Sequence, residues 1–377
     1  MPDIEIREVQ SSGDLRTFIE FPLKLYKNER YYVPHLLSDR KKFFDKKTNP
    51  FFQHARVRYY LALNNSRPVG RIAGIVNNLH NEYNNEKTGF FGFLDCINDL
   101  EIASGLLDAA TEFSKNEGMD IIRGPANFST NDEVGLLIEG FDSLPAFMMT
   151  YNPPYYIDLY EKLGLHKVED LIAYYIDDRS APSDRVLRIV EKMRSRGKID
   201  IRTIRMDDFL NELELIRIIY NGAWSKNWGF IPMTPDEFSH VANDFKKIID
   251  PDLAFIAFVD GQPAGFSLAL PDYNPIFKKM NGHLFPLGLF KFLYHTKIKK
   301  SLTGLRLLTM GVIHKYHNIG LDMIFFVDTY NEGIRKGYHW AEISWVLERN
   351  VLMNKAAIQM GAKPYKKYRI YEKPILR

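Results

Sequence analysis

The chain of 377 residues is poor in cysteine and carries little net charge. Cys96 is the only cysteine, which excludes an intramolecular disulfide and a metal site built on several thiolates. The formal net charge of +3 is too small to indicate nucleic acid as a partner. No apolar run approaches the ~20 residues that span a bilayer, and the charged N-terminus "MPDIEIREVQ" is unlike a signal peptide. We therefore expect a cytoplasmic globular protein.

Length and composition favour two domains. Hydrophobic residues make up 45% and charged residues 26%, an ordinary globular balance, and 377 residues exceed what one core typically organises. Aromatic residues reach 14%, which predicts thick cores or large apolar grooves.

Hydrophobic periodicity predicts one order of elements twice: strand, helix, hairpin, strand, helix, strand, helix, strand. The first copy is predicted as strand 4–9, helix 14–28 behind Asp14, hairpin 55–77, strand 89–96, helix 101–118, strand 119–125, helix 155–164 and strand 166–176. The second copy is predicted as strand 199–209, helix 210–224, hairpin 253–271, strand 305–313, helix 321–337, strand 340–348, helix 351–361 and strand 363–373.

A polar tract separates the copies. Residues 177–198, "DDRSAPSDRVLRIVEKMRSRGK", favour a linker with one helix capped by Ser183. We place the boundary near residue 178, which predicts an N-terminal domain over 1–178 and a C-terminal domain over 179–377. Both are predicted to have mixed α/β architecture.

The repeated order, with a hairpin before the central strand, resembles the GCN5-related N-acetyltransferase (GNAT) fold used twice. That family's fourth helix reads roughly Asn-x-x-Ala-x-x-x-Tyr-x-x-x-Gly-Phe. In the first copy "LYEKLGL" supplies Tyr160, Gly164 and Leu165 in register, with Asn152 displaced by one residue.

The second copy keeps less of this helix pattern. Asn350, Gly361 and Ala362 hold the register, whereas Met353 replaces the alanine and Ala357 replaces the tyrosine. The resemblance implies a helix that packs along an acyl-coenzyme A.

The stretch "GVIHKYHNIGLD" resembles the family's phosphate loop, Arg/Gln-x-x-Gly-x-Gly/Ala, with His317, Gly320 and Asp322 in those places. A strand that turns through a glycine into a helix directs backbone amides to one point, where the helix dipole favours a pyrophosphate. The preceding strand would hold the thioester carbonyl on its own amides. The cofactor site implied by the resemblance comprises Met310, Gly311, Val312, His317, Asn318, Ile319, Gly320, Leu321, Asp322 and Asn350.

The corresponding stretch of the first copy, "LDCINDLEIASG", has no glycine turn. Its acidic residues Asp95, Asp99 and Glu101 would repel a pyrophosphate. We therefore expect a degenerate cofactor site in the first copy, one acyl-coenzyme A per chain as substrate, and no metal.

Acyl transfer to an amine needs a base, and an acid can serve the leaving thiolate. Glu342 and Glu348 lie at even spacing on one predicted strand, so both side chains would share a face. Tyr365, Tyr368 and Tyr371 on the last strand are candidate acids, because Ala357 removes the usual tyrosine. We take Glu342, Glu348 and Tyr368 as catalytic candidates; the alternatives are a surface ion pair for a carboxylate and a core position for a tyrosine.

Two long polar loops are candidates for the acceptor site. "GPANFSTNDEVGLLIEGFD" contains Asn131 and Glu133, and "NGAWSKNWGFIPMTPDEF" contains Trp224, Asn227 and Trp228. We expect these residues to bind the acceptor in a cleft between the copies. The alternative is a hydrophobic plug between domains.

An insertion over 274–304 lies between the second hairpin and the central strand. It alternates apolar groups with lysines, namely Lys278, Lys279, Lys291, Lys297, Lys299 and Lys300. A basic amphipathic segment is typical of a membrane-surface element. The alternative is a helix that covers the core of the second domain.

The whole pattern resembles a family of bacterial tandem-domain acyltransferases, which implies transfer of an acetyl or longer acyl group from coenzyme A to a primary amine. One alternative is a long-chain N-acyltransferase that acts on a lipid-like amine. The other is a non-catalytic GNAT-fold ligand-binding protein. The acceptor, acyl length, base and oligomeric state stay open.

Overall fold

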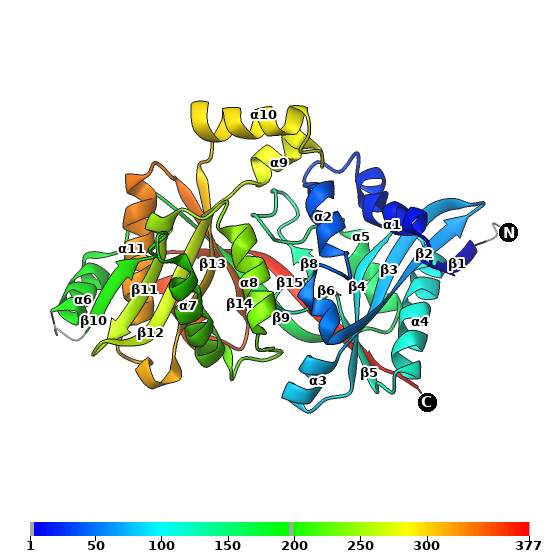
Figure 1. The fold of residues 1–377 in the computed structure, drawn as a ribbon, viewed down its shortest axis with the longest axis horizontal. Coiled ribbons are helices and arrows are strands. Elements are labelled where there is room, and N and C mark those ends of the chain that lie inside the picture. The colour runs from blue at the N-terminus through cyan, green and yellow to red at the C-terminus, as the bar shows by residue number, and fades with distance from the viewer. Residues whose placement is uncertain (1–3, 196–198, 377) are drawn as a thin grey trace. The chain divides into compact units, whose positions relative to one another are not determined.

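The computed structural model describes residues 4–195 and 199–376. Residues 196–198, at the end of the predicted linker, and the first three residues of the N-terminal stretch lie outside the described residues. The chain forms two compact units (Figure 1). Unit 1 comprises residues 1–170, 273–300 and 366–377, and unit 2 comprises residues 171–272 and 301–365.

Unit 1 is built mainly from the first copy of the repeat. Its elements are β1 (Ile4–Glu8), α1 (Ser12–Leu25), α2 (Leu37–Phe43), β2 (Ala55–Asn64), β3 (Arg67–Asn77), α3 (Asn78–Asn84), β4 (Thr88–Cys96), α4 (Leu100–Asn116), β5 (Ile121–Gly124), β6 (Ala126–Asn127), β7 (Glu133–Val134), β8 (Leu136–Glu139), α5 (Tyr155–Lys162), α9 (Asn274–Met280), α10 (Leu287–Leu293) and a π-helix (Tyr294–Ile298). A 3-10 turn, Pro50–Gln53, precedes β2.

Unit 2 is built from the second copy. Its elements are α6 (Asp184–Arg194), β10 (Ile199–Thr203), α7 (Phe209–Trp224), α8 (Pro235–Phe245), β11 (Ala254–Val259), β12 (Gln262–Pro271), β13 (Gly304–Val312), α11 (Leu321–Arg335), β14 (Trp340–Leu347) and α12 (Val351–Gln359). Two 3-10 turns, Pro251–Leu253 and His314–Tyr316, precede β11 and α11. The strands β9 (His166–Asp177) and β15 (Lys363–Pro374) each run from one unit into the other.

Both units have mixed sheets with one parallel pair. Unit 1 contains strands in the order β1-β2-β3-β4-β5-β15, and among the described residues of this series only β4 and β5 pair in parallel. Unit 2 contains β9-β14-β13-β12-β11-β10, in which β13 and β14 are parallel. The prediction of a mixed α/β fold is therefore confirmed.

The last strand of each copy was predicted from its alternation, but alternation does not identify the neighbouring strand. In unit 1, β15 pairs with β5 and β8. In unit 2, β9 pairs with β14. Each unit therefore holds the closing strand of the other copy. The boundary near residue 178 divides the chain by sequence copy, and it stays a prediction.

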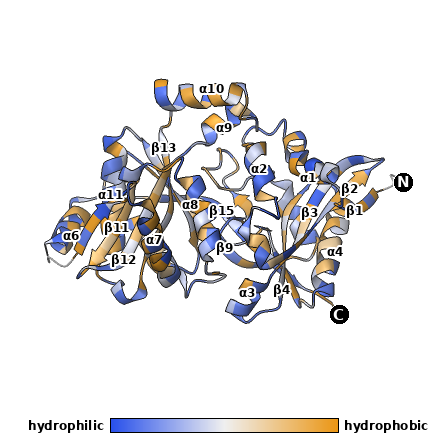
Figure 2. Ribbon diagram, viewed as in Figure 1, coloured by the Kyte–Doolittle hydropathy of each residue, from blue (hydrophilic) through white to orange (hydrophobic). Residues whose placement is uncertain are grey.

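Side chains alternate across the sheet of unit 2, as period-two strands require. Phe255, Ala257 and Val259 of β11 join the core beneath α11, whereas Ile256 of the same strand packs against α7. Figure 2 shows the apolar stripes of these strands in orange. The two faces of unit 2 thus carry different helices, and this separates the two groups of residues described below.

Several local predictions need correction. The first helix begins at Ser12 with Ser11 as its N-cap, because Ser11 and Asp14 form a reciprocal capping box in which Asp14 is the third helical residue. Of the insertion predicted over 274–304, residues 274–300 belong to unit 1, so the alternative that its helix covers the core of the second domain is wrong. The helix capped by Ser183 is confirmed as α6.

Candidate active site

Two parallel strands of unit 2 separate in the middle of the sheet. β13 and β14 pair from Gly304 and Trp340 as far as Leu307 and Ile343. Beyond that point β13 continues to pair with β12, and the register of β13 shifts between the partners of Leu268 and Ala269. Backbone amides of a strand point alternately toward its two neighbouring strands. In residues 308–312 of β13, the amides that point toward β14 therefore have no hydrogen-bond partner on β14 within the described pairing.

The turn that follows β13 leads directly into α11. Asn318 and Gly320 have φ angles of 68° and 83°, and Gly320 is the N-cap of α11. Within the described residues no side chain caps this helix. The amides of Leu321, Asp322 and Met323 lie in the first turn, where helix geometry leaves them without intrahelical partners. This arrangement is an anion-binding geometry.

Two side chains of unit 2 lie against this turn. The His317 Nε2 atom lies 2.9 Å from the carbonyl oxygen of Val312, so the ring folds back onto the end of β13. A Cβ atom at Gly320 would overlap the sulfur of Met193, which comes from α6. Met193 is a flexible side chain and can move. Ile319 packs at the edge of the core.

An aromatic wall stands beside the end of β13. A Cβ atom at Gly311 would overlap the Trp224 ring, so this glycine permits the indole of α7 to lie on the strand backbone. Trp224 stacks on Tyr220 with ring centroids 4.8 Å apart and contacts Phe266 at 5.7 Å. The predicted acceptor residue Trp224 and the predicted cofactor residue Gly311 are therefore in contact.

The other two acceptor candidates of the loop that contains Trp224 are Asn227 and Trp228. The amide of Asn227 donates to the carbonyl oxygen of Trp224 over 2.8 Å, which holds the end of α7 in a turn. The Arg349 guanidinium lies over the Trp228 ring at 5.6 Å.

A buried polar network occupies the base of the strand separation. Arg306 and Glu342 are direct neighbours in the β13–β14 register, and both side chains are buried. Ser344 donates from Oγ to Glu342 Oε1, and Tyr365 donates from its hydroxyl to Glu342 Oε2. Arg306 Nε donates to Ser344 Oγ over 3.0 Å. The carboxylate thus has two hydroxyl donors and a cation within the same cluster.

The other carboxylate candidate has a different position. β14 ends at Leu347, and Glu348 is exposed in the turn that follows. The register of β14 also shifts between Ile343 and Val346, so even spacing does not carry Glu342 and Glu348 to one face of the strand. That part of the prediction is wrong. Asn350 accepts from the amide of Met353 over 3.2 Å and is the N-cap of α12.

Three predicted residues lie in unit 1. Tyr368 is fully buried on β15. The amide of Asn131 donates to Ser129 Oγ over 3.1 Å. Glu133 accepts from Arg40 Nη2 over 2.5 and 2.7 Å and from Asn127 Nδ2 over 3.1 Å. Burial opposes the charge of Glu133, but Arg40 and His35 outweigh it and lower the pKa of this carboxyl to about 2.

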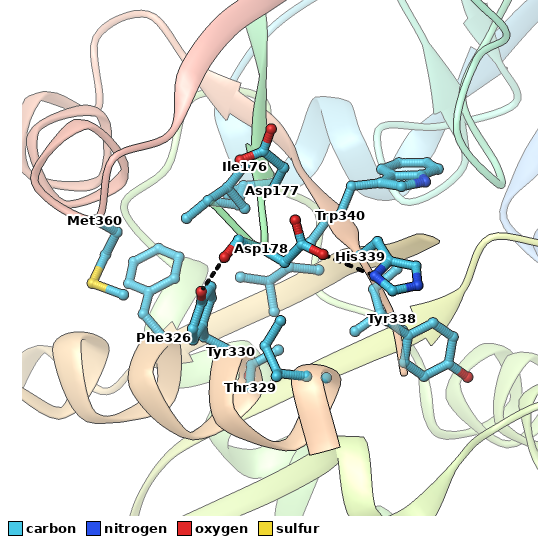
Figure 3. A pocket seen from close by; sticks show the side chains of 16 residues that line it. Ile176, Asp177, Asp178, Phe326, Thr329, Tyr330, Tyr338, His339, Trp340 and Met360 are labelled. Carbon is cyan, nitrogen blue, oxygen red and sulfur yellow. Dashed lines mark hydrogen bonds and ion pairs between the residues drawn. The ribbon is translucent and has the colours of Figure 1, made fainter. Parts of the chain in front are cut away.

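A separate, shallow pocket opens on the α11 side of unit 2 (Figure 3), with about 530 Å³ of space that includes the open solvent at its mouth. Its floor is apolar, with Leu305 and Leu307 from β13 and Ile343 from β14. At the rim the Asp178 carboxylate lies 2.8 Å from His339 Nδ1, and Tyr330 donates to the carbonyl oxygen of Asp178. The floor residues alternate with Arg306 and Glu342, so the pocket and the polar network lie on opposite faces of the sheet.

Sequence reasoning did not identify Arg306, Ser344 or Arg40. Ser344 follows Glu342 by two residues, which places both on one face of a strand, and this signal was available in the sequence. Arg306 and Arg40 act through long-range contacts that no local pattern reveals. In the described ranges no group of three or more His, Cys, Asp or Glu side chains is placed to hold a metal ion.

Solved structures define the class of the fold. A tandem GNAT protein from the clavulanic acid biosynthesis pathway covers 100% of this chain and 99% of its own, with a TM-score of 0.58 and 12% identity. A GCN5-related N-acetyltransferase from Sphaerobacter thermophilus covers 100% of this chain and 98% of its own, with a TM-score of 0.54 and 11% identity. The protein is a tandem GNAT-fold protein, as the resemblance implied.

Two relatives then define the family. Protein YghO of Escherichia coli (strain K12) is 34% identical over 375 residues, which are 98% of this chain and 95% of the relative. The bacterial ceramide synthase of Caulobacter vibrioides (strain NA1000 / CB15N) is 33% identical over 378 residues, 99% of this chain and 98% of the relative. The chain belongs to the family of these two proteins. No protein-family model matches it.

Proposed function

We propose that the protein is an N-acyltransferase that joins a long acyl chain from acyl-coenzyme A to the primary amine of a long-chain amino alcohol. The observation that carries the proposal is the full-length relationship to a bacterial ceramide synthase, at 33% identity over 99% of this chain. A ceramide is the amide of such an amino alcohol. This relationship favours the long-chain alternative over acetyl transfer to a small amine.

The geometry of unit 2 supports a thioester site beside β13. The glycine turn at Gly320 and the first-turn amides of α11 would bind the pyrophosphate of coenzyme A. The amides of Met310, Gly311 and Val312 that face the strand separation would polarise the thioester carbonyl. The thioester of acyl-coenzyme A would supply the activated acyl group, and these residues would orient it.

The polar network at the strand separation supports a proton relay. When the amine nitrogen forms its bond to the acyl carbon and the carbon–sulfur bond breaks, the amine must lose a proton. We assign Tyr365 as the group that takes this proton as its own hydroxyl proton passes to Glu342. The thiolate then takes a proton from solvent. Tyr365 lies in unit 2 with Glu342, so it replaces Tyr368 as the tyrosine candidate.

Aromatic and apolar surfaces in unit 2 suit alkyl chains. Trp224 and Tyr220 form a wall beside Gly311, where an acceptor tail would lie. The pocket beneath α11 has an apolar floor, and we assign it to the distal part of the acyl chain. Ala341 lines this pocket, so Ala341→Phe should shift the preferred donor from palmitoyl to a shorter chain such as octanoyl.

The assignment is tested by coenzyme A release with palmitoyl- and acetyl-coenzyme A, each offered with sphinganine and with spermidine. Mass spectrometry of the organic phase identifies the amide. We expect turnover with palmitoyl-coenzyme A and sphinganine, and loss of turnover in Glu342→Gln. Activity confined to acetyl-coenzyme A and spermidine would remove the lipid assignment. Tight binding of acyl-coenzyme A without turnover of either amine would favour a ligand-binding protein.

A further inference from the structure

The insertion of unit 1 has one face that is anchored to its own unit. Asn274 Nδ2 donates to the carbonyl oxygen of Pro145 over 2.8 Å, and Lys278 Nζ donates to the carbonyl oxygens of Arg30 and Tyr32. The ring of Phe147 contacts those of Tyr273 and Phe277 at 5.7 and 5.8 Å. These contacts make α9 a fixed base for the residues that follow it.

The outer face of the insertion, which we call the insertion face, is strongly apolar yet exposed. It comprises Phe285, Leu287, Phe290, Leu293, Tyr294 and Ile298. The exposed fractions of Phe285, Phe290 and Ile298 are 69%, 70% and 74%. Large apolar side chains gathered on one short segment mark an interaction site, whereas scattered single ones do not. Figure 2 shows hydrophobic residues in orange and hydrophilic residues in blue along α10.

Spacing places these side chains along one stripe. Leu287, Phe290 and Tyr294 follow each other by three and four residues, as neighbours on one helix face do, and Ile298 continues the series in the π-helix. Phe292, between them, points inward and stacks on Tyr273 at 5.7 Å. The stripe therefore remains on the surface while the opposite side of the helix packs.

The charged residues of the insertion itself have one sign. Residues 273–303 contain six lysines and no aspartate or glutamate. Lys278 points inward, whereas Lys297, Lys299 and Lys300 are exposed beside Ile298. Aromatic and aliphatic side chains flanked by lysines without any acid are complementary to an anionic lipid surface.

We propose that the insertion face docks the protein on the surface of an anionic lipid bilayer, with the apolar stripe in the headgroup region and the lysines on the lipid phosphates. This adds a membrane-surface partner to the protein and does not depend on acyl transfer. It places the enzyme at the surface where water-insoluble amino alcohols reside. In the described part of the chain no helix is long and apolar enough to cross a membrane.

Sedimentation with vesicles tests the proposal on the full chain without any acyl-coenzyme A. Wild type should bind vesicles of phosphatidylglycerol and phosphatidylcholine and bind weakly to phosphatidylcholine alone. Phe285→Ser/Phe290→Ser/Ile298→Ser should weaken binding roughly tenfold or more, because it removes three inserting groups. Lys297→Gln/Lys299→Gln/Lys300→Gln should weaken binding to anionic vesicles by about a hundredfold. Leu210→Ser, which changes a leucine 81% exposed on α7, is the matched control and should bind as wild type does.

A site-specific probe keeps the test independent of any folding defect. Cys96 is fully buried, and burial together with Asp95 raises the pKa of its thiol to about 12, so it resists labelling. An environment-sensitive fluorophore on Phe290→Cys should shift to the blue with anionic vesicles, and the same fluorophore on Leu210→Cys should not. Absence of vesicle binding by wild type, equal loss in the Leu210→Ser control, or self-association through this face without vesicle binding would each overturn the proposal.

Discussion

The two copies of the repeat differ at the start of the helix that follows the central strand. In unit 1 the helix after the central strand, α4, is capped by Asp99, whose carboxylate accepts from the amides of Glu101 and Ile102. In unit 2 the corresponding helix, α11, begins at Gly320, and no side chain of the described residues caps it. One helix start carries a carboxylate on its amides, and the other has no such cap within the described residues.

The space between the parallel strands, β4 and β5 in unit 1 and β13 and β14 in unit 2, also differs between the copies. In unit 1, β5 ends at Gly124, and the segment that follows enters the gap: Asn127 Oδ1 accepts from the amide of Phe93 over 2.8 Å, and a Cβ atom at Gly92 would overlap the carbonyl oxygen of Ala126. In unit 2 the chain passes from the end of β14 through a short turn into α12. In unit 1 the side-chain oxygen of Asn127 thus occupies the position at which the proposed site of unit 2 would hold a thioester carbonyl.

The comparison teaches how a repeated fold divides its roles. Asp99 and Asn127 of unit 1 accept from amides at the start of α4 and in β4, whereas in the described part of unit 2 no side chain caps α11 and a buried carboxylate lies beside the strand separation. We therefore expect one acyl-coenzyme A per chain, bound by unit 2. The following variants break or sharpen this difference, from the largest effect to the smallest.

Glu342→Gln should cause the largest loss. It keeps the shape of the buried side chain but removes the proton acceptor, so kcat should fall by roughly 10²–10⁴ with little change in the affinity for coenzyme A. Tyr365→Phe should produce a loss of similar size if the relay passes through its hydroxyl. Glu348→Gln is the matched control, because this exposed carboxylate lies beyond β14. A Glu348→Gln defect as large as that of Glu342→Gln would contradict the assignment of the base.

Glu133→Gln should affect stability rather than catalysis. The buried ion pair with Arg40 would be broken, which should lower the free energy of unfolding by about 3 kcal/mol in urea titrations. Because the pKa of Glu133 is lowered to about 2, its stabilisation is complete above pH ~4.5 and is lost as pH falls toward 2. The variant should therefore lose the steep acid dependence of wild type between these values.

The control for Glu133→Gln is Glu139→Gln, which removes an exposed partner of Lys367 and should cost under about 1 kcal/mol. A raised KM for the amine in Glu133→Gln, with unchanged stability, would instead support the prediction that Glu133 binds the acceptor.

Gly320→Ala should weaken binding of coenzyme A by about tenfold. An alanine is strained at a φ of 83°, and it would overlap Met193. Gly337→Ala carries the same strain, with φ at 82° and open space around the added atom at the other end of α11, and it should leave affinity unchanged. Calorimetry of Gly320→Ala/Met193→Ala separates the two causes. Full recovery of affinity in the double variant would show that Met193, not the turn, sets the loss.

Asp99→Ala should have the smallest effect. Loss of the cap should cost about 1 kcal/mol in thermal unfolding, because two amides at the start of α4 lose their acceptor. The stoichiometry of coenzyme A should stay at one per chain, since Asn127 still occupies the strand gap. A second binding event in this variant would show that the carboxylate alone excludes the ligand from unit 1.

Local patterns predicted much of the fold. The hairpin predicted over 253–271 is β11 and β12, which join through Asp260 and Gly261, and Gly337 follows the last turn of α11 with a φ of 82°. These features depend on a few neighbouring residues, so alternation or helical spacing in the sequence predicts them directly. The short strands β6 to β8 were missed because two- to four-residue strands leave no periodic signal.

Long-range features were beyond such patterns. The alternation of β9 and β15 predicts strands, yet pairing of β15 with β5 depends on side chains about 250 residues apart, such as Arg123 and Glu372 at 2.8 Å. Glu133 resembled an acceptor residue because its loop is polar, and only the fold brings Arg40 to it. Of the second-copy candidates, Glu342 lies on the strand that the spacing predicted, and its register with Arg306 places it at the base of the strand separation.

Amide hydrogen exchange with and without palmitoyl-coenzyme A tests the central difference between the copies most directly. It reads the backbone amides that we assign to the ligand, in both units and in one experiment. We predict added protection in peptides covering 310–312 and 318–323 of unit 2, and unchanged exchange in the corresponding stretch 93–102 of unit 1. Protection in 93–102, with none in 318–323, would contradict the account.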